Sequence, residues 1–565
     1  MKEFTLRAVI LGIILSVIFG ASNAYLGLKA GMTVSASIPA ACVSMAILRG
    51  ILKGGTILEN NIVQTIASAG ESLAAGIIFT IPALILLGIN PSIFYIFLTS
   101  LLGGILGVVF MILVRKKFIE EEDKDLPFPE GRACAEVLKA GDEGGEKAKS
   151  VFEGIFSGFL YRFFALGFKL FPDVFYFNFK NKINLGFENS PALLGVGIIL
   201  GRRISFFLLG GGLLGWFVLI PLIGNYFPEA KLFDPHTIWS KYIRYIGAGA
   251  VFAGGFISFL KILFPLFKER SFYSFRPGEK DLPLSFIFIS SLIIYLLISI
   301  LPFFNQNFFT SLLIVIFSLI FVVVSSRIVG LVGSSSNPVS GMTIATLFTF
   351  SLIIYSLGGR GFPAMIASLT TGAFVCISAA IAGDISQDLK TGYLLGATPK
   401  LQEIGEIIGV ITSSIFIGFT LFLLHKAYVI GSEKLSAPQA TLMSLIVKGI
   451  FEGDMPFNLF FTGIMITVFL EILGISSLPV AVGLYLPLSL STPIALGGII
   501  SDLIKKKEKG VLLASGFVAG DAISGIVLAI IILSGISLFN FNILNPLFGV
   551  ISLLIFSIYT FFRLK

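Results

Sequence analysis

Long apolar runs recur along almost the whole chain, and they constrain its fold more than any other feature. Crossing about 30 Å of hydrocarbon takes about 20 apolar residues in a helix. About sixteen runs reach this length. They lie, with ragged ends, at 5–27, 31–50, 58–88, 93–114, 151–171, 204–224, 241–264, 283–303, 308–330, 340–358, 362–382, 404–426, 456–474, 478–504, 511–536 and 546–562. An open strand would leave its backbone unpaired in lipid, so we expect an all-α polytopic integral membrane protein.

The composition supports a membrane-embedded chain and excludes several other classes. Of the 565 residues, 56% are hydrophobic and only 13% are charged, whereas a soluble domain carries about 25% charged residues. So few ionic groups could not cover a water-soluble globule of this length. Three cysteines and two histidines are too few for a disulfide framework or a histidine/cysteine metal cage, so we expect no metal site and no bound cofactor.

Positive charge is placed in short clusters between the apolar runs, which sets the expected orientation. Lysine and arginine concentrate in the cytoplasmic loops of membrane proteins. The clusters that we assign to the cytoplasm are Lys2 with Arg7, Arg49 with Lys53, Arg115–Lys117, Lys505–Lys509 and Arg563 with Lys565. They predict a multi-pass protein of the cytoplasmic membrane with both termini inside. A basic patch for nucleic acid is the alternative reading of the net charge of +8, but the dispersed clusters favour membrane lipid, not nucleic acid, as a partner.

Two further choices concern the N-terminus and the hydrophilic loop. Residues 1–27 imitate a signal peptide, because basic residues precede an apolar run and Ser22-Asn23-Ala24 looks like a cleavage site. A long series of similar runs follows, so we take these residues as the first span. Residues 115–150 form the only sizeable hydrophilic loop, rich in acidic and basic residues, and we place it in the cytoplasm.

An internal repeat relates two parts of the sequence. Segment 23–33 runs from an asparagine into Gly-Met-Thr, and segment 337–343 does the same, with the two triplets 310 residues apart. Segment 191–195 begins with proline and ends with glycine, as does segment 479–483 at an offset of 288 residues. Two offsets near half the chain length, in the same order, predict a duplication.

The duplication divides the chain into an N-terminal transmembrane repeat at 1–282, which includes the hydrophilic loop, and a C-terminal repeat at 283–565. Glycine and proline crowd segments 27–39 and 333–341, which predicts broken or re-entrant helices there. Freed backbone groups of broken helices line interior sites, and duplicated halves that meet at the membrane midplane are typical of secondary transporters.

Lys29 lies beside the first predicted helix break, after Asn23 and Tyr25. A broken helix presents unpaired N–H groups and the positive end of its dipole, which suit a carboxylate. Lys29 would add a formal charge to that site. The alternative is a lysine in an ordinary outer loop.

One face of the run at 58–88 carries polar side chains. They recur at steps of three or four residues and include Glu59, Asn60, Gln64, Ser68 and Glu71. Lipid could not accommodate such a face, so we expect it to line an interior cavity, and a cytoplasmic amphipathic extension is the alternative. Burial disfavours the charged form of a carboxyl group, which makes Glu59 and Glu71 candidate proton carriers.

A third polar group lies in segment 383–393, between two apolar spans. Its ionisable and amide residues are Asp384, Gln387, Asp388 and Lys390. Ionisable residues inside membrane spans are functional candidates, and a plain cytoplasmic loop is the alternative here.

Asp521 stands alone in the apolar run at 511–536, where we expect it to face a cavity or to cap a neighbouring element. The sequence contains no Gly-x-x-x-x-Gly-Lys-Ser/Thr loop for ATP and no His-Glu-x-x-His motif. An aspartate pair of Asp384 with Asp521, as in an intramembrane protease, would not explain about sixteen spans and a duplication. We therefore expect a transporter and not an enzyme.

Several motifs resemble the oligopeptide transporter (OPT) family, closest to its prokaryotic and yellow stripe-like branch. The resemblance runs from about residue 5 to 540 and is carried by Asn23–Pro39, Glu59–Thr65, Gly383–Tyr393 and Leu478–Ser489. It implies proton-coupled import of small peptides or of metal–chelate, siderophore-like complexes through about sixteen helices. The Asn-Pro-Gly and Lys-Ile-Pro-Pro-Arg signatures of the fungal and plant peptide branch are absent, which argues against long peptides.

From these observations we expect a secondary active symporter that works by alternating access, with the proton gradient as its energy source. The predicted substrate-binding residues are Asn23, Tyr25, Lys29, Asn61, Gln64, Asn337 and Tyr393. The predicted proton-coupling residues are Glu59, Glu71, Asp384 and Asp388. Small peptides are the first substrate class and metal–chelate complexes the alternative. An uncoupled channel or membrane scaffold is the second alternative, and the sequence leaves a homo-oligomer open.

Overall fold

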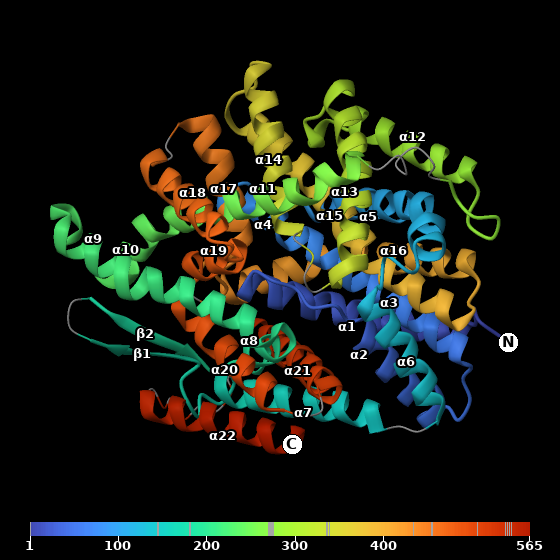
Figure 1. Cartoon of the computed structure of the whole chain (residues 1–565), viewed down its shortest axis with the longest axis horizontal. Coiled ribbons are helices and arrows are strands. Elements are labelled where there is room, and N and C mark those ends of the chain that lie inside the picture. Colours follow the sequence, from blue (N-terminus) through green and yellow to red (C-terminus); the bar gives the residue numbers. More distant parts are fainter. Residues whose placement is uncertain are drawn as a thin grey trace. The chain divides into compact units, whose positions relative to one another are not determined.

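The structure is a computed structural model, and it describes residues 2–565 apart from 144–145, 180–181, 269–275, 335–336, 338, 433, 454–455, 505–506, 537, 539–540, 542 and 544. Most of the described backbone is helical (Figure 1). Within it, ten helices are long and apolar enough to cross a membrane, and four apolar helices are shorter. The prediction of an all-α polytopic membrane protein is confirmed.

The predicted apolar runs do not all become single long helices. The shorter apolar helices occupy four of the runs, at 31–50, 283–303, 456–474 and 478–504. The last of these runs is divided, because the chain is extended at Leu486 and Pro487 before the next helix begins, and proline cannot continue a preceding helix without losing a hydrogen bond. Conversely, the run at 204–224 belongs to a longer continuous element, Pro191–Tyr226, which bends at Gly201 with φ of 76°.

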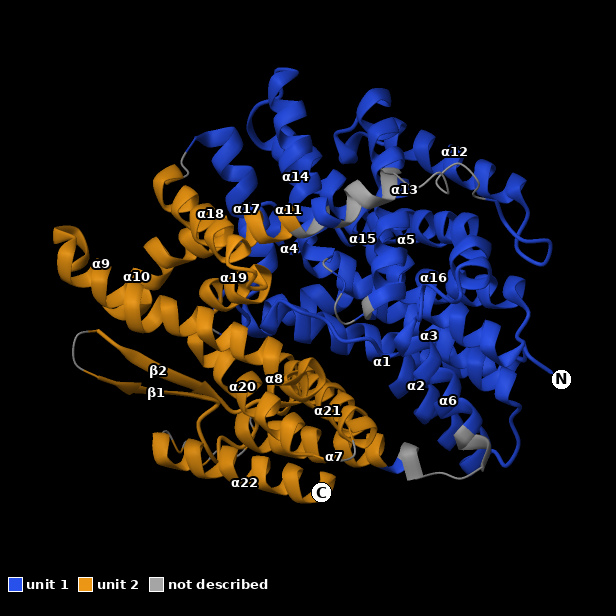
Figure 2. Ribbon diagram, viewed as in Figure 1, with its two compact units in different colours: residues 1–149, 259–454 blue, residues 150–258, 455–565 orange. Residues whose placement is uncertain are grey.

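Contacts divide the chain into two compact units (Figure 2). Unit 1 comprises residues 1–149 and 259–454, and unit 2 comprises 150–258 and 455–565. Each unit therefore combines residues from both predicted halves. Both Gly-Met-Thr segments belong to unit 1, and both Pro-to-Gly segments belong to unit 2. The duplication itself stays a prediction.

Unit 1 is built around two almost fully enclosed helices. Its helices are α1 (Leu6–Ala30), α2 (Ser37–Met45), α3 (Ile57–Ile78), α4 (Ile81–Leu86), α5 (Ile93–Arg115), α6 (Pro129–Glu143), α12 (Leu284–Ile300), α13 (Phe308–Val332), α14 (Val339–Ser356), α15 (Gly361–Leu395), α16 (Pro399–Tyr428) and α17 (Pro438–Glu452), with short π-helical or 3-10 turns at Ala46–Ile51, Lys116–Glu121 and Pro302–Phe304. The apolar windows of Ile57–Leu86 and α15 are 89% and 94% buried. Because protein surrounds them, α3 and α15 can carry the polar residues that lipid would reject.

Unit 2 holds the remaining elements. Its helices are α7 (Glu146–Leu166) and α11 (Arg244–Lys268), each of which extends slightly across the unit boundary, with α8 (Pro191–Leu213), α9 (Ile220–Tyr226), α10 (Pro235–Ile238), α18 (Phe457–Ile472), α19 (Ser477–Tyr485), α20 (Leu488–Leu503), α21 (Lys507–Leu533) and α22 (Pro546–Leu564), and shorter turns at Leu214–Leu219, Pro228–Ala230 and Trp239–Ile243. An antiparallel hairpin of β1 (Val174–Asn178) and β2 (Asn184–Glu188) pairs Phe175 with Phe187 and lies beside α20 and α22 (Figure 1).

Close helix packing in unit 2 depends on glycine. A Cβ on Gly197 of α8 would overlap the carbonyl oxygen of Ile494 on α20, and a Cβ on Gly497 would overlap that of Leu194. Small residues let membrane helices approach closely, because association there depends on van der Waals packing. The α8–α20 contact is therefore intolerant of side chains at these two positions.

We predict that Gly197→Ala destabilises the protein by about 1–3 kcal/mol, the usual cost of forcing extra atoms into a packed interior. Gly210→Ala is the matched control on the same helix, because a Cβ there meets no atom within 4 Å and alanine is the better helix former. Thermal unfolding in detergent should show a lower midpoint for the first variant only. Equal midpoints would contradict the packing argument.

Candidate functional site

Two interruptions of helices meet at one cavity in unit 1. Helix α1 ends at Ala30, Gly31 adopts a left-handed conformation with φ of 71°, and α2 begins only at Ser37. Helix α13 ends at Val332 and α14 begins at Val339. The cavity has a volume of about 100 Å³ and is lined by Gly31, Met32, Thr33, Ser35, Glu71, Ala75, Phe79, Ser334, Asn337, Val339, Ser340, Ala380 and Asp384. Both interruptions are the ones that glycine and proline predict.

Glu71 and Asn23 hold the unwound segment between α1 and α2. The Asn23 side-chain amide donates to Glu71 Oε1, and the backbone amide of Ala36 donates to Glu71 Oε2 at 3.3 Å. The amide of Val34 donates to Asn23 Oδ1 at 3.2 Å. These side chains replace helix hydrogen bonds that the chain gives up when it unwinds.

Asp388 lies one helical turn after Asp384 on α15 and is fully buried. Its Oδ1 accepts from Ser37 Oγ at 2.8 Å and from the Gln64 side-chain amide. Ser37 Oγ also lies 2.9 Å from Ser68 Oγ. The start of α2, the polar face of α3 and the acidic turn of α15 therefore form one hydrogen-bonded group.

The structure brings six of the predicted site residues together. Glu71, Asp384 and Asn337 line the cavity, and Asn23 contacts Glu71 directly. Gln64 and Asp388 bond to each other at the adjoining turn of α15.

The other predicted site residues lie elsewhere in unit 1. Lys29 and Tyr25 are buried beside each other, with Lys29 Nζ 5.9 Å from the centre of the Tyr25 ring, and neither is among the residues that line the cavity. Tyr393 is 43% exposed near the end of α15. Asn61 is fully buried, and neither polar atom of its side chain has a hydrogen-bond partner in the described part of the chain. Their roles in substrate binding stay predictions.

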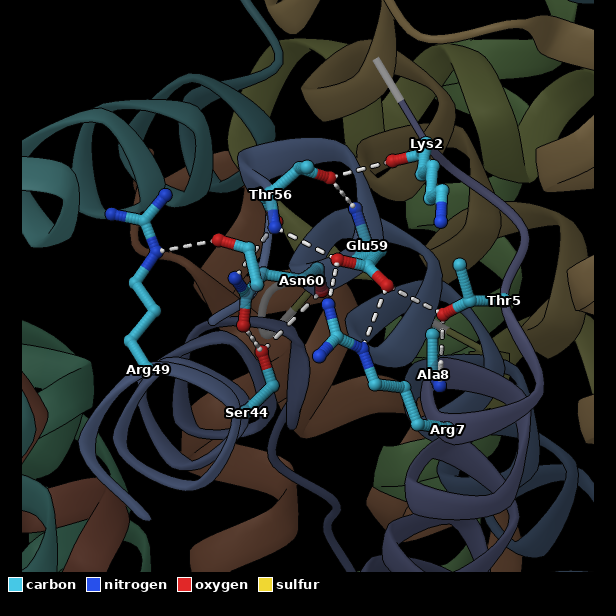
Figure 3. A network of polar contacts seen from close by, with 10 residues as sticks. Lys2, Thr5, Arg7, Ala8, Ser44, Arg49, Thr56, Glu59 and Asn60 are labelled. Atoms are coloured by element: carbon cyan, nitrogen blue, oxygen red, sulfur yellow. Dashed lines mark hydrogen bonds and ion pairs between the residues drawn. The ribbon is translucent and has the colours of Figure 1, made fainter. Parts of the chain in front are cut away.

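Glu59 occupies a structural position at the start of α3 (Figure 3). Its carboxylate accepts from Arg7 Nε at 2.9 Å and Nη2 at 2.7 Å and from Thr5 Oγ1 at 2.6 Å. It also completes a capping box with Thr56, in which each residue satisfies an amide at the helix start. These bonds explain a buried Glu59 without a role in proton coupling, which stays a prediction for this residue.

Part of the predicted hydrophilic loop 115–150 folds onto the acidic motif of α15. The backbone amide of Gly131 on α6 donates to Gln387 Oε1 at 2.6 Å, and Thr391 Oγ1 donates to the Gly131 carbonyl at 3.0 Å. The buried Lys390 ammonium donates to the Ile119 carbonyl at 2.7 Å and pairs with Asp123. Helix α6 therefore covers the end of the polar group that contains Asp388.

Several ionic residues are buried where the sequence did not predict it, among them Arg115 of a predicted cytoplasmic cluster. Arg115 Nε lies 2.7 Å from Asp281 Oδ1, and its Nη2 donates to Glu120 at 2.7 Å. Glu403 accepts from the Leu282 amide at 2.8 Å, and Glu406 lies one turn further along α16. The signal that could have revealed them is a set of polar residues at helical spacing around the start of an apolar run, namely Gln402, Glu403 and Glu406.

Asp521 in unit 2 caps the start of a neighbouring helix, which is one of the two roles predicted for it. Its Oδ2 accepts from Ser190 Oγ at 2.6 Å and from the Ala192 amide at 3.0 Å at the start of α8. Its Oδ1 lies 3.2 Å from Nε of the buried Arg162. In the parts of the chain that the structure describes, no group of three His, Cys, Asp or Glu residues could hold a metal ion.

Comparison with known proteins gives one family and several relatives. The profile of the family described as "OPT oligopeptide transporter protein" matches residues 3–532. The "Putative oligopeptide transporter" of Haemophilus influenzae is 32% identical over 91% of this chain and 93% of its own length. "Metal-nicotianamine transporter YSL2" of Arabidopsis thaliana is 23% identical over 78% of this chain and 76% of its own. "Putative oligopeptide transporter YGL114W" of Saccharomyces cerevisiae is 23% identical over 93% and 96%.

We predict that Glu59→Gln and Arg7→Gln each lower the thermal unfolding midpoint, because each removes the charge-assisted bonds that join α1 to the start of α3. The double variant should cost little more than either single change, as expected for two residues that act through one contact. Unfolding of all four proteins in detergent measures this. Fully additive losses would show that the two side chains act independently.

Asp123 predicts how the attachment of α6 depends on pH, because it pairs both with Lys390 of α15 and with Arg132 of α6, at 2.6 Å from Arg132 Nη2. The Lys390 ammonium lowers the pKa of Asp123 below its ordinary value, which is about 3.9 in an unfolded chain. The pair therefore stabilises the fold above about pH 4, and this contribution is lost as the pH falls through the lowered pKa of Asp123. In Asp123→Asn the contribution is missing at every pH.

Hydrogen exchange of residues 129–139, followed by mass spectrometry between pH 3 and 7, measures this attachment. The wild type should lose protection on acidification, and Asp123→Asn should be less protected throughout. Asp125→Asn is the control, because Asp125 is exposed on the same turn. Protection of α6 that is equal in wild type and Asp123→Asn would rule out the pair as its anchor.

Proposed function

The chain belongs to the OPT oligopeptide transporter family, and from this premise we propose that it is a proton-coupled symporter of small peptides or peptide-like substrates that works by alternating access. Members of this family are transporters and not enzymes. We place the protein in the cytoplasmic membrane with both termini inside, because its basic clusters follow the positive-inside rule.

One observation supports this proposal above the others: two interrupted helix pairs and two carboxyl groups, Glu71 and Asp384, border the same cavity. Secondary transporters bind substrates and coupling ions where discontinuous helices expose backbone groups inside the membrane. Buried carboxyl groups at such a place can take up and release protons.

The lining of the cavity suits a substrate that carries both a positive and a negative charge. Glu71 and Asp384 can accept hydrogen bonds from a protonated amine, and the Asn337 amide can meet a peptide group. Helix α14 begins at the cavity with Val339, and the start of a helix favours a carboxylate. Both ends of a short peptide therefore find complementary groups.

The size of the cavity fits a closed stage of a transport cycle. A volume of about 100 Å³ is well below the roughly 300–1,000 Å³ of pockets that enclose a drug-sized ligand. A whole peptide therefore enters only if the surrounding helices move apart. Movement of one proton charge yields about 2.3 kcal/mol per 100 mV, enough for an accumulation of tens-fold without ATP.

Metal–chelate complexes are the second candidate substrates. Relatives such as YSL2 are named as metal-nicotianamine transporters, and the carboxyl and amide groups of the cavity could bind the polar groups of an organic chelator. The chelator would satisfy the metal, so the protein would need no histidine or cysteine ligands.

We predict that substrate-driven proton uptake falls roughly tenfold or more in Glu71→Gln and Asp384→Asn, because an amide cannot carry the proton. Purified protein in vesicles is supplied with di- and tripeptides in one arm and an iron–nicotianamine complex in the other, and internal pH is followed. Glu229→Gln, at an exposed position, is the control. The arm that acidifies wild-type vesicles identifies the substrate class. Equal substrate flux in all variants without proton movement would show an uncoupled channel.

A further inference from the structure

Glu406 is an acidic residue that the proposed cavity does not use. It lies on α16, inside a helix long and apolar enough to cross a membrane. Its side chain is fully buried, and neither carboxyl oxygen has a hydrogen-bond partner within the described residues. Such a group requires an explanation, because buried polar atoms in proteins are almost always paired.

Other buried carboxyl groups of unit 1 have partners. Glu71 accepts from the Asn23 side chain and the Ala36 amide. Asp388 accepts from Ser37 and Gln64, and Glu403 accepts from the Leu282 amide. Glu406 differs from these residues in that both of its oxygens lack such donors.

The surroundings of Glu406 are fixed by its neighbours on α16. One turn earlier, the Gln402 side-chain amide lies 3.2 Å from Thr65 Oγ1 on α3 and 3.0 Å from the Asp388 carbonyl on α15. One turn later, Gly409 packs against the backbone of Ile66 on α3. The face of α16 that holds Glu406 is therefore enclosed by α3 and α15.

Three acidic groups act on Glu406. They belong to Asp388 and Asp384 on α15 and to Glu403 on α16. On the helices packed against α16, Glu71 bonds to Asn23 and Glu59 pairs with Arg7. Lys29 of α1 lies beside the Tyr25 ring, and Lys390 of α15 pairs with Asp123. Arg115 of α5 pairs with Asp281 and Glu120 and lies 3.9 Å from Glu403. An ionised carboxylate without a partner is costly to bury, and nearby like charges add to the cost. This conformation therefore accommodates Glu406 as a neutral acid.

Acceptors without partners lie on the two helices that enclose Glu406. Asp388 Oδ2 on α15 and Gln64 Oε1 on α3 are buried and have no hydrogen-bond partner in the described structure. Asp388 also belongs to the group that reaches the cavity through Ser37 and Ser68. A series of polar residues thus extends from the cavity towards α16.

From this placement we propose that Glu406 is a further proton-carrying residue of the transport cycle, an inference that rests on the proposed proton coupling. The two side chains share no hydrogen bond in the described structure, so the step that we assign to Glu406 takes place when helix movement brings them into contact: the O–H bond of Glu406 breaks and an O–H bond forms on the Asp388 carboxylate. Glu406 becomes the anion and Asp388 becomes neutral, so the total charge of the pair is unchanged. Glu406 acts on the proton and makes no contact with substrate.

Two transport assays on Glu406→Gln separate this role from a structural one. The amide has the shape of the neutral acid, so exchange of di- and tripeptides across vesicles without a pH gradient should stay within about twofold of wild type. Accumulation driven by a pH gradient should fall about tenfold, and its dependence on pH should flatten. Glu452→Gln, on the partly exposed Glu452–Lys448 pair of α17, should behave as wild type in both assays.

Three results would overturn the inference. If Glu406→Gln keeps the accumulation and proton uptake of the wild type while Glu71→Gln loses both, the role of Glu406 is rejected and the proposed coupling is not. Wild-type vesicles that exchange peptide without moving protons would reject the proposed coupling together with it.

Infrared spectroscopy of the wild type gives an independent readout, because a protonated Glu406 contributes a carboxylic acid band that the glutamine variant lacks. Should that variant fail to fold, Glu406→Asp should keep a shifted acid band and part of the accumulation, and an unshifted spectrum would reject the inference.

Discussion

Backbone amides and carbonyls inside a membrane must find partners within the protein, and this requirement decides how unit 1 can contain a cavity. The chain leaves helical geometry after Ala30 and resumes it at Ser37. The amides of Val34 and Ala36, which the helix no longer pairs, donate to Asn23 and Glu71. The interruption is stable because side chains from α1 and α3 replace the missing bonds.

The same side chains connect the fold to the chemistry of the cavity. Glu71 both holds the unwound segment and lines the cavity. Hydrogen bonds to an ionised acceptor are stronger than those to a neutral one. The ionic state of Glu71 and the conformation of residues 31–36 are therefore coupled through the same bonds. Asp388 on α15 likewise has a structural contact as well as a chemical one, since it bonds to Ser37, the first residue of α2.

Local sequence patterns predicted those features that depend on neighbours along the chain. The apolar runs, the glycine-rich interruptions and the polar face with Glu71 follow from the requirements of single helices. The positions of Lys29 and Glu59 depend on long-range contacts, such as the pairing of Glu59 with Arg7, which no local pattern shows. Glu406 was overlooked because one acid in an apolar run does not reveal which neighbouring helices enclose it. Helix α6 was missed because its partners on α15 lie more than 250 residues away.

The way each unit combines distant stretches of chain has a consequence for biosynthesis. Arg162 is buried against Asp521, which follows it by 359 residues. At about 10 residues per second, a ribosome needs roughly half a minute to make the intervening chain. Throughout that interval the guanidinium of Arg162 can pair with Asp173, 11 residues further along the chain, but not yet with Asp521. The local pair can therefore neutralise Arg162 from the start, and the packing of α7 against α21 in unit 2 is completed only once Asp521 has been made.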